Sequence, residues 1–291
     1  MEANSEYFSP AWFLPHWLLR RRGTIYLANF HDPLRKRRFG PAWWHALTVR
    51  LGYAPLAGGL IHGPAPPGAY LPLRLIIREA PFGPFADLAG RPAPFDLRAR
   101  LGIPREAFVL LAFGHVADRK NLDLVIDALA GQHQAHLVVA GRPGSSADRA
   151  LAFYAGRARQ AGVAARVHFV EAFIPDSDVP AYFAAADAIA LTYAREFVSQ
   201  SGVLQIAALF DKPLLASGGE GPLPATVREY DLGVVVEPDS VKAIAAGLER
   251  LIAEPRDLSA NFARYRASTS WQVNVDRLLE VVAAVKASRS A

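Results

Sequence analysis

Glycine, hydroxyl and cationic side chains recur where short apolar runs end, and these residue types can hold a phosphate. Gly114 follows one apolar run and precedes Arg119 and Lys120 by a few positions. Small and hydroxyl residues at 199–202 follow another run and precede a helix-patterned segment. Free backbone N–H groups at a helix start, together with lysine or arginine, are common phosphate donors in proteins. The sequence therefore predicts an anion site, and the two segments together suit a diphosphate.

The elements that must position these residues are short apolar runs separated by helix-patterned segments. The runs lie at 108–113, 136–140, 167–170, 188–192, 213–216 and 233–237. Runs of this length, spaced by helices, are typical of a parallel sheet that is buried on both faces. Ligands of such α/β sheets bind beyond the carboxyl ends of the strands. The glycines and hydroxyls follow those ends, so we expect them at one edge of the sheet.

Each of these motifs also has a purely structural interpretation. Ser199 and Ser201 can serve as an ordinary helix N-cap, and Arg119 and Lys120 can belong to a solvated turn. Gly218 and Gly219 can form a plain turn rather than a loop that approaches a ligand. In the front segment, His31 and Asp32 end a predicted strand, where such a pair positions a base, binds a sugar hydroxyl or has only a structural role.

Composition excludes several classes of protein. The chain has 291 residues, 52% of them hydrophobic and 20% charged, which indicates a globular protein with one or two domains. It has no cysteine, no apolar run long enough to span a bilayer and no secretory leader pattern, which favours a cytoplasmic location. Its histidines lack metal-like spacing, and HExxH, GxSxG, Walker and GxGxxG motifs are absent. No metal site and no cofactor are expected.

The net charge of +5 is concentrated near the front, at residues 20–22 and 35–38. Aromatic residues and leucines at 12–19 precede the first arginines, a pattern typical of contact with an anionic membrane surface. A packed apolar segment with a solvated basic end explains the same residues. No nucleic-acid-binding motif accompanies the charge, so nucleic acid is not an expected partner.

The distribution of these patterns predicts four parts of the chain. Residues 1–90 form a small N-terminal domain, and residues 91–106 form a proline-rich linker. Residues 107–265 form the C-terminal ligand-binding domain, in which Ser240 caps a helix. Residues 266–291 form a last helix, for which packing back on the N-terminal domain is one expected arrangement.

Taken in order, these segments resemble a GT-B glycosyltransferase of the large retaining family that includes glycogen synthases and bacterial mannosyltransferases, glycosyl transferases group 1. The resemblance covers residues 107–253. In that family a Gly-Arg-x-x-x-x-Lys segment holds the donor diphosphate, and Gly114 and Lys120 keep its spacing with His115 at the arginine position. Arg119 can substitute for that arginine. The strand that leads to Gly141, the segment 167–187 and residues 212–219 also resemble family motifs.

The chain departs from the family pattern in two places. The family's two glutamates, eight residues apart, would fall on Val198 and Ile206, with Glu196 and Gln205 near but out of register. Residues 199–203 instead resemble a branch with Ser-Gln-Ser-Gly-Val in place of that pair. The front segment resembles only the latter half of the family's N-terminal domain, so either that domain is reduced or a partner chain supplies the rest.

The resemblance implies an α/β fold of GT-B type, with a Rossmann-like C-terminal domain and a reduced N-terminal α/β domain. It implies hexosyl transfer from a nucleotide-diphosphate sugar, with retention, to a saccharide or lipid-linked acceptor in cell-surface polysaccharide or glycolipid synthesis. A non-catalytic sugar-nucleotide-binding subunit that needs a partner chain, or a homodimer, is the alternative. Location would be cytoplasmic, with peripheral attachment to the inner face of the membrane left open.

The resemblance assigns catalytic roles to His31 and Lys120. The donor-binding residues that it implies are Gly114, His115, Arg119, Lys120, Gly141, Glu196, Ser199, Gln200, Ser201, Gly202, Gln205, Gly218 and Gly219.

Overall fold

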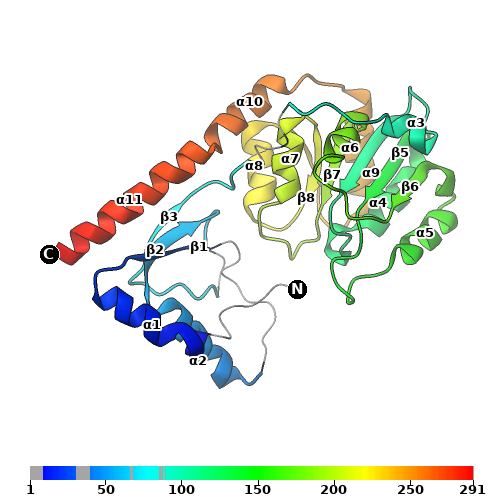
Figure 1. Ribbon diagram of the computed structural model, residues 1–291. Coiled ribbons are helices and arrows are strands. Elements are labelled where there is room, and N and C mark those ends of the chain that lie inside the picture. Colours follow the sequence, from blue (N-terminus) through cyan, green and yellow to red (C-terminus); the bar gives the residue numbers. More distant parts are fainter. Residues whose placement is uncertain (1–8, 31–39, 66–67, 85–87, 89, 291) are drawn as a thin grey trace. The chain divides into compact units, whose positions relative to one another are not determined.

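The computed structural model describes residues 9–30, 40–65, 68–84, 88 and 90–290. The chain divides into two compact units, one made of residues 1–81 with 269–291 and the other of residues 82–268 (Figure 1). Within the described residues, no helix is both long and apolar enough to cross a membrane. His31 lies outside the described residues, so its predicted role stays a prediction.

Residues 82–268 form a six-stranded sheet in the order β6-β5-β4-β7-β8-β9, in which every neighbouring pair is parallel. The strands are β4 (Phe108–Phe113), β5 (Ala135–Ala140), β6 (Val167–Val170), β7 (Ala188–Thr192), β8 (Leu214–Ser217) and β9 (Gly233–Val235). Each apolar run predicted as a strand forms one, with ends shifted by two residues at most. The predicted α/β class with a parallel sheet is confirmed.

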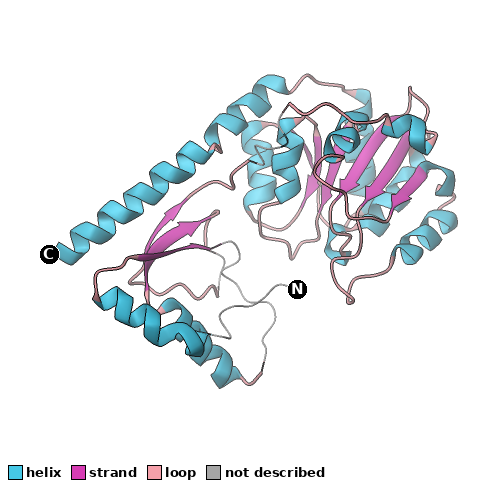
Figure 2. Cartoon of the chain, viewed as in Figure 1, coloured by secondary structure: helices cyan, strands magenta, loops and turns pink. Residues whose placement is uncertain are grey.

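Helices cover both faces of this sheet (Figure 2). They are α3 (Leu97–Leu101), α4 (Leu122–Ala128), α5 (Leu151–Gln160), α6 (Val179–Ala185), α7 (Gly202–Leu209), α8 (Pro222–Tyr230), α9 (Val241–Ala253) and α10 (Ser259–Ser268). One core cluster joins the sheet to α3, α6, α7, α8 and α10, and the other joins it to α4, α5 and α9. Burial on both faces explains why the strands read as continuous apolar runs.

Alternate residues of the central strand supply the two cores. Val109 and Leu111 of β4 belong to the cluster with α6 and α7, whereas Leu110 belongs to the cluster with α4 and α5. The helix α9 begins where the sequence predicts, since the Ser240 hydroxyl accepts a hydrogen bond from the Ala243 N–H at 3.2 Å.

The other unit contains a three-stranded parallel sheet in the order β1-β2-β3. Its strands are β1 (Tyr26–Phe30), β2 (Leu56–Ile61) and β3 (Ile76–Glu79), and its helices are α1 (Ser9–Arg21), α2 (Ala42–Tyr53) and α11 (Trp271–Ser290). Val281 and Val285 of α11 pack against Leu60 and Ala80 in a small core. The last helix of the chain therefore belongs to the same unit as the front segment.

Candidate functional site

The candidate site lies where the strand order reverses. The chain runs from β4 outward to β5 and β6 and then returns to β7 on the other side of β4. At such a switch point, loops leave the two central strands in opposite directions and open a crevice beyond their carboxyl ends. Gly114 directly follows β4, and Thr192 is the last residue of β7. These residues mark the two sides of the crevice.

Two glycines shape the loop that follows β4. Gly114 has φ +82° and donates its N–H to the Ala140 carbonyl at 2.9 Å. Gly141, which follows β5, has φ +150°, and a Cβ atom there would lie 2.0 Å from the Gly114 carbonyl oxygen. Only glycine allows this close approach of two backbones without displacement. The conformation of the β4 loop therefore depends on a residue 27 positions further along the chain.

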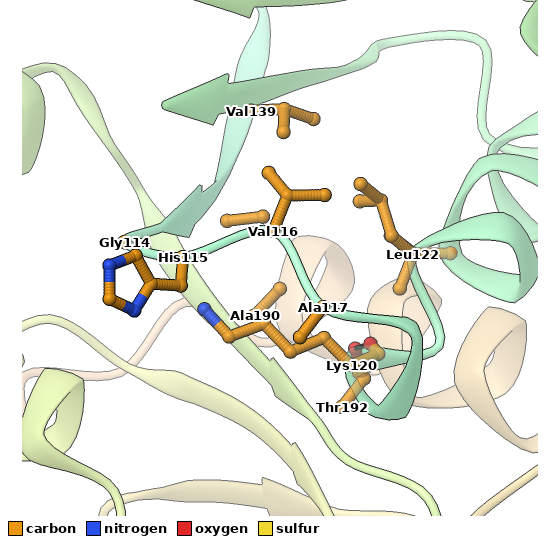
Figure 3. A pocket seen from close by; sticks show the side chains of 11 residues that line it. Gly114, His115, Val116, Ala117, Lys120, Leu122, Val139, Ala190 and Thr192 are labelled. Carbon is orange, nitrogen blue, oxygen red and sulfur yellow. Dashed lines mark hydrogen bonds between the residues drawn. The ribbon is translucent and has the colours of Figure 1, made fainter. Parts of the chain in front are cut away.

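Lys120 reaches back under this loop from a short 3-10 helix (η3, Asp118–Lys120). Its Nζ donates to the Phe113 carbonyl oxygen at 2.8 Å, and it lies 3.9 Å from the point at which a side chain on Gly114 would begin (Figure 3). A small pocket surrounds it, and its lining residues are Ala112, Gly114, His115, Val116, Ala117, Lys120, Leu122, Val125, Val139, Ala190 and Thr192. The predicted residues Gly114, His115 and Lys120 thus meet in one pocket.

The Lys120 ammonium occupies an unfavourable environment for a charge. Burial, with a smaller contribution from the neighbouring Arg119 guanidinium, lowers the pKa of Lys120 to about 8. Arg119 itself is exposed at the loop surface. Two cations placed together, one of them desolvated, would be stabilised by an anion between them. The electrostatics of this loop therefore favour a negatively charged ligand.

Hydrogen bonds hold the backbone that carries these two cations. The Thr192 hydroxyl donates to the Lys120 carbonyl at 3.0 Å, and the Ala194 N–H donates to the Arg119 carbonyl at 2.8 Å. The loop that follows β7 is thereby fastened to the loop that follows β4. Thr192 was missed by the sequence analysis, although its place as the last polar residue of a central strand was a usable signal.

Asp118 anchors the first residue of the same short helix. Its carboxylate accepts hydrogen bonds from the Arg149 backbone N–H and the Tyr154 hydroxyl, both at 3.1 Å, and pairs with the Arg149 guanidinium. Burial opposes ionisation of this group, but these hydrogen bonds outweigh it and lower the pKa of Asp118. These contacts thus fix the start of the short helix that carries Lys120.

The start of α7 forms the third part of the site. A methyl carbon of Val203 lies 3.8 Å from the position of a Cβ on Gly114, so this helix begins beside the glycine loop. Ser201 occupies the N-cap position, but its hydroxyl makes no cap hydrogen bond and lies 3.0 Å from the Tyr193 hydroxyl instead. The interpretation of Ser201 as an ordinary side-chain cap is wrong for this reason. The first N–H groups of α7 and its dipole remain suited to an anion.

Other predicted residues lie close to this helix start without joining the pocket around Lys120. Gln200 donates its amide to the Thr226 hydroxyl at 3.2 Å and accepts from the Ser201 N–H. Glu196 is exposed, and Ser199 is partly exposed on the loop before α7. Their predicted contacts with a donor stay predictions.

Gln205 has a structural role in this fold. Its side chain is 1% exposed, and its amide donates to the Tyr265 hydroxyl of α10. This bond fastens α7 to α10 in the interior. Its predicted contact with a donor stays a prediction, whereas its partner 60 residues away could not be read from a local pattern.

The glycines after β8 are explained by packing between loops. A Cβ on Gly219 would lie 2.1 Å from the Arg195 carbonyl oxygen, and one on Gly221 would lie 2.8 Å from the Val198 Cα. Gly218 is less constrained, with the Phe197 carbonyl oxygen at 3.2 Å. These glycines therefore let the β8 loop lie directly against the β7 loop. The predicted contact of Gly218 and Gly219 with a ligand stays a prediction.

Comparisons with known proteins identify the C-terminal unit. Residues 95–269 match the family model described as "Glycosyl transferases group 1". The chain is similar to the D-inositol 3-phosphate glycosyltransferase of Thermomonospora curvata, with 32% identity over 200 residues that cover 65% of this chain and 46% of that protein. The enzyme of the same name from Mycobacterium tuberculosis is 30% identical over 190 residues, covering 62% and 38%. The chain thus spans less than half the length of these curated relatives.

Solved structures resemble the fold over nearly the whole chain. Anabaena Alr3699/HepE in complex with UDP has a TM-score of 0.73 at 20% identity, covering 96% of this chain and 77% of that one. Sucrose-phosphate synthase from Thermosynechococcus elongatus has a TM-score of 0.67 at 21% identity, covering 95% and 72%. At these identities the likeness establishes a shared fold, which is the GT-B type.

Proposed function

Because this chain belongs to the glycosyl transferases group 1 family, we propose that it transfers a hexosyl group from a nucleotide-diphosphate sugar to another molecule. The observation that carries this proposal is the convergence of Gly114, Lys120 and the start of α7 beside the switch point of the sheet. This arrangement presents a lysine, a glycine turn and helix N–H groups to one small volume. Those are the groups that a diphosphate requires.

The chemistry proposed for these residues is stabilisation of a leaving group. When the glycosidic bond to the donor phosphate breaks, negative charge builds on the departing nucleoside diphosphate. The Lys120 ammonium and the dipole of α7 would oppose that charge from fixed positions, and positioned donors of this kind lower a barrier by several kcal/mol. Exposed Arg119 would contribute from the rim. His31 is proposed to orient the donor sugar, and transfer with retention is proposed because the family is a retaining one.

The solved relatives support the donor class. One structure of Alr3699/HepE contains UDP and another contains UDP-glucose. The curated relatives are named as glycosyltransferases of an inositol phosphate. For this chain we propose a uridine-type donor as the first to test, and a saccharide or lipid-linked acceptor in cell-surface polysaccharide or glycolipid synthesis.

The sequence at the start of α7 supports membership of a particular branch. Val198 and Ile206 occupy the positions of the family's two glutamates, and Ser199, Gln200, Ser201 and Gly202 lie between them. We propose that backbone N–H groups and hydroxyls hold the phosphates here. The same substitution supports the second candidate function, a non-catalytic subunit that binds the nucleotide sugar and needs a partner chain, or a second copy, for transfer.

Peripheral contact with a membrane is a further part of the proposal. On α1, Leu14 and Leu18 are 59% and 49% exposed, and Arg20 and Arg21 occupy the last turn of the same helix. Apolar side chains beside arginines suit an anionic lipid surface. This contact would bring the protein to a lipid-linked acceptor.

The test is a binding and turnover experiment with the whole chain. Thermal-shift and calorimetric titrations with UDP-, GDP- and ADP-sugars would be made on the wild type, on Lys120→Met, and on Lys242→Met as the matched control. Lys242 is an exposed lysine on α9, so its loss should change nothing. We expect one nucleotide class to bind, with affinity about 10- to 100-fold lower in Lys120→Met because one charge-assisted hydrogen bond is lost.

Two results would decide between the candidate functions. Slow hydrolysis of the bound nucleotide sugar by the purified chain would favour the enzyme. Binding without any turnover, under conditions in which a characterised glycosyltransferase hydrolyses its donor, would favour the binding subunit. Absence of binding to every donor would reject both.

A further inference from the structure

A second cavity lies at the opposite edge of the large sheet. It has a volume of about 320 Å³, and its walls include Phe108 at the start of β4, Gly233 at the start of β9, and Pro213 just before β8. Volumes of this order are found for small-molecule sites. Gly114 follows the far end of β4, and a strand of six residues extends roughly 20 Å. The cavity is therefore separate from the crevice that holds Lys120.

The cavity has an apolar wall and a charged rim. The apolar side chains that line it are Phe108, Phe210, Pro213, Val234, Leu251, Ile252, Pro255 and Leu258. The charged side chains are Asp187, Asp211, Lys212, Arg250, Glu254 and Arg256. Its lining therefore offers a surface for a ring or chain and several charges for one polar end.

Ion pairs compensate every charge of this rim except one. Asp187 pairs with Arg98 at 2.6 Å and also accepts the Val109 N–H at 2.7 Å. The other pairs are Asp211 with Arg266, Arg250 with Glu254, and Arg256 with Asp231. The backbone N–H of Lys212 donates to the Ala207 carbonyl, but its ammonium makes no hydrogen bond or ion pair with the part of the chain that the structure describes. The rim counted together with its pairing partners thus carries one surplus positive charge, that of Lys212.

The position of Lys212 makes this surplus costly. Lys212 lies between Asp211 and Pro213 in the sequence, just before β8. It is half-buried, so its ammonium is partly withdrawn from water. Burial lowers the pKa of Lys212, and attraction from Asp187 and Asp211 does not fully offset that effect. A half-buried cation without a partner is stabilised when an anion enters the cavity.

We propose that this cavity binds a small organic anion, whose charged group pairs with Lys212 and whose apolar part lies against Phe108 and Phe210. The remaining N–H groups of Arg250, which uses only its Nε toward Glu254, can donate to the same anion. The site is independent of the donor crevice. Phosphate esters and carboxylates share the required chemistry.

Calorimetric titration of the whole chain tests the proposal. Phenyl phosphate and benzoate are the anionic probes, and benzyl alcohol is the neutral one. All titrations contain excess UDP, so that the crevice around Lys120 is filled. If UDP does not bind, a parallel series uses Lys120→Met. The variants are Lys212→Met, which keeps the aliphatic stem, and Lys242→Met as the exposed-lysine control.

We expect at least one anion to bind the wild type and Lys242→Met equally, and Lys212→Met about tenfold or more weakly. Benzyl alcohol should bind none of them measurably. Preference for phenyl phosphate or benzoate would identify the anionic group. Failure of both anions to bind the wild type at millimolar concentration would overturn the proposal, as would equal binding to Lys212→Met. Neither result would affect nucleotide binding, so the proposed function is tested separately.

Discussion

At the scale of single residues, Lys120 joins the sequence motif to the chemistry. The amino acid and its spacing from Gly114 are visible in the sequence, but its desolvation and its bond to the Phe113 carbonyl arise only in the fold. A lysine whose pKa is about 8 is charged at neutral pH yet responds to alkaline conditions. That value makes the role of Lys120 testable by pH.

Nucleotide affinity should fall as pH rises above 8. The free protein loses the Lys120 proton near pH 8, whereas a bound diphosphate favours the protonated form. Affinity for UDP should therefore be constant from pH 7 to about 8 and decrease by up to about tenfold per pH unit above it. Lys120→Met should bind weakly with a flat profile between pH 7.5 and 10. Calorimetry in buffers of different ionisation enthalpy would measure both affinity and proton uptake.

The same pKa has an opposite consequence for folding. The unfolded chain keeps the Lys120 proton up to about pH 10.5, whereas the folded chain releases it near 8. Between these values the unfolded state binds more protons, so this group makes the free energy of unfolding rise with pH. For the binding prediction above, a pH profile of UDP affinity that is the same in the wild type and in Lys120→Met would contradict the assignment of the lowered pKa to Lys120.

At the scale of elements, the site depends on loops that touch through glycines. Gly141 after β5 lies against Gly114 after β4, and Gly219 after β8 lies against the β7 loop at Arg195. The strands bring the loop starts together, because all carboxyl ends of a parallel sheet lie at one edge. The glycines then let these loops approach more closely than side chains would permit.

Gly141→Ala should damage both stability and binding. Its φ of +150° disfavours any side chain, and the new Cβ would lie 2.0 Å from the Gly114 carbonyl oxygen. Strain and displacement of the β4 loop should reduce the free energy of unfolding by about 2–4 kcal/mol and weaken UDP binding. Chemical denaturation and calorimetry would measure the two effects.

Gly131→Ala is the matched control for that substitution. A Cβ on Gly131 meets nothing within 4 Å, and its φ is not in the left-handed region. Its stability should change by less than about 1 kcal/mol, in either direction. Equal stability of the two alanine variants would show that the β4 and β5 loops do not need this contact.

At the scale of the whole molecule, the two units differ in the size of their hydrophobic cores. Residues 82–268 hold two extensive core clusters and all described residues of the crevice. The other unit has two small cores around a three-stranded sheet and includes the last helix of the chain. Nucleotide binding and acceptor recognition are thus expected to separate experimentally.

Residues 82–268 should fold alone and bind the nucleotide. This unit has its own hydrophobic core on each face of its sheet, which meets the usual requirement for an autonomous domain. We expect a cooperative thermal transition and UDP affinity within about threefold of the whole chain, whereas sugar transfer should be lost. Non-cooperative melting of this fragment would contradict the division at Pro81 and Ser268.

Membrane contact should depend on the exposed face of α1. The whole chain should sediment with vesicles that contain anionic lipid and not with zwitterionic vesicles, since arginines near the surface contribute about 1 kcal/mol each. A double change of Leu14 and Leu18 to Asp should abolish sedimentation. Phe173→Asp, at a side chain that is 70% exposed in the other unit, is the control. Equal binding to both vesicle types would reject the lipid surface.

The sequence by itself determined the α/β class, the six strands of the large sheet and the order of its motifs. Apolar runs bounded by glycines have one physical solution, because strands buried on both faces must be covered by the helices between them. The spacing of Gly114 and Lys120, and the small residues before α7, could therefore be assigned to one edge of the sheet. Family resemblance then supplied the donor class.

Only the tertiary structure decided what each polar side chain does. Ser201 lies beside Tyr193 rather than capping its own helix, and Gln205 is bound to Tyr265 in the interior. Thr192 holds the lysine loop, and the Lys212 ammonium at the far edge has no hydrogen-bond or ion-pair partner among the described residues. Local pattern fixes which face of an element is buried, but a hydrogen-bond partner many residues away is set by packing. For that reason, the meeting of Gly114, His115 and Lys120 at one edge of the sheet was predictable, and the partners of the individual side chains were not.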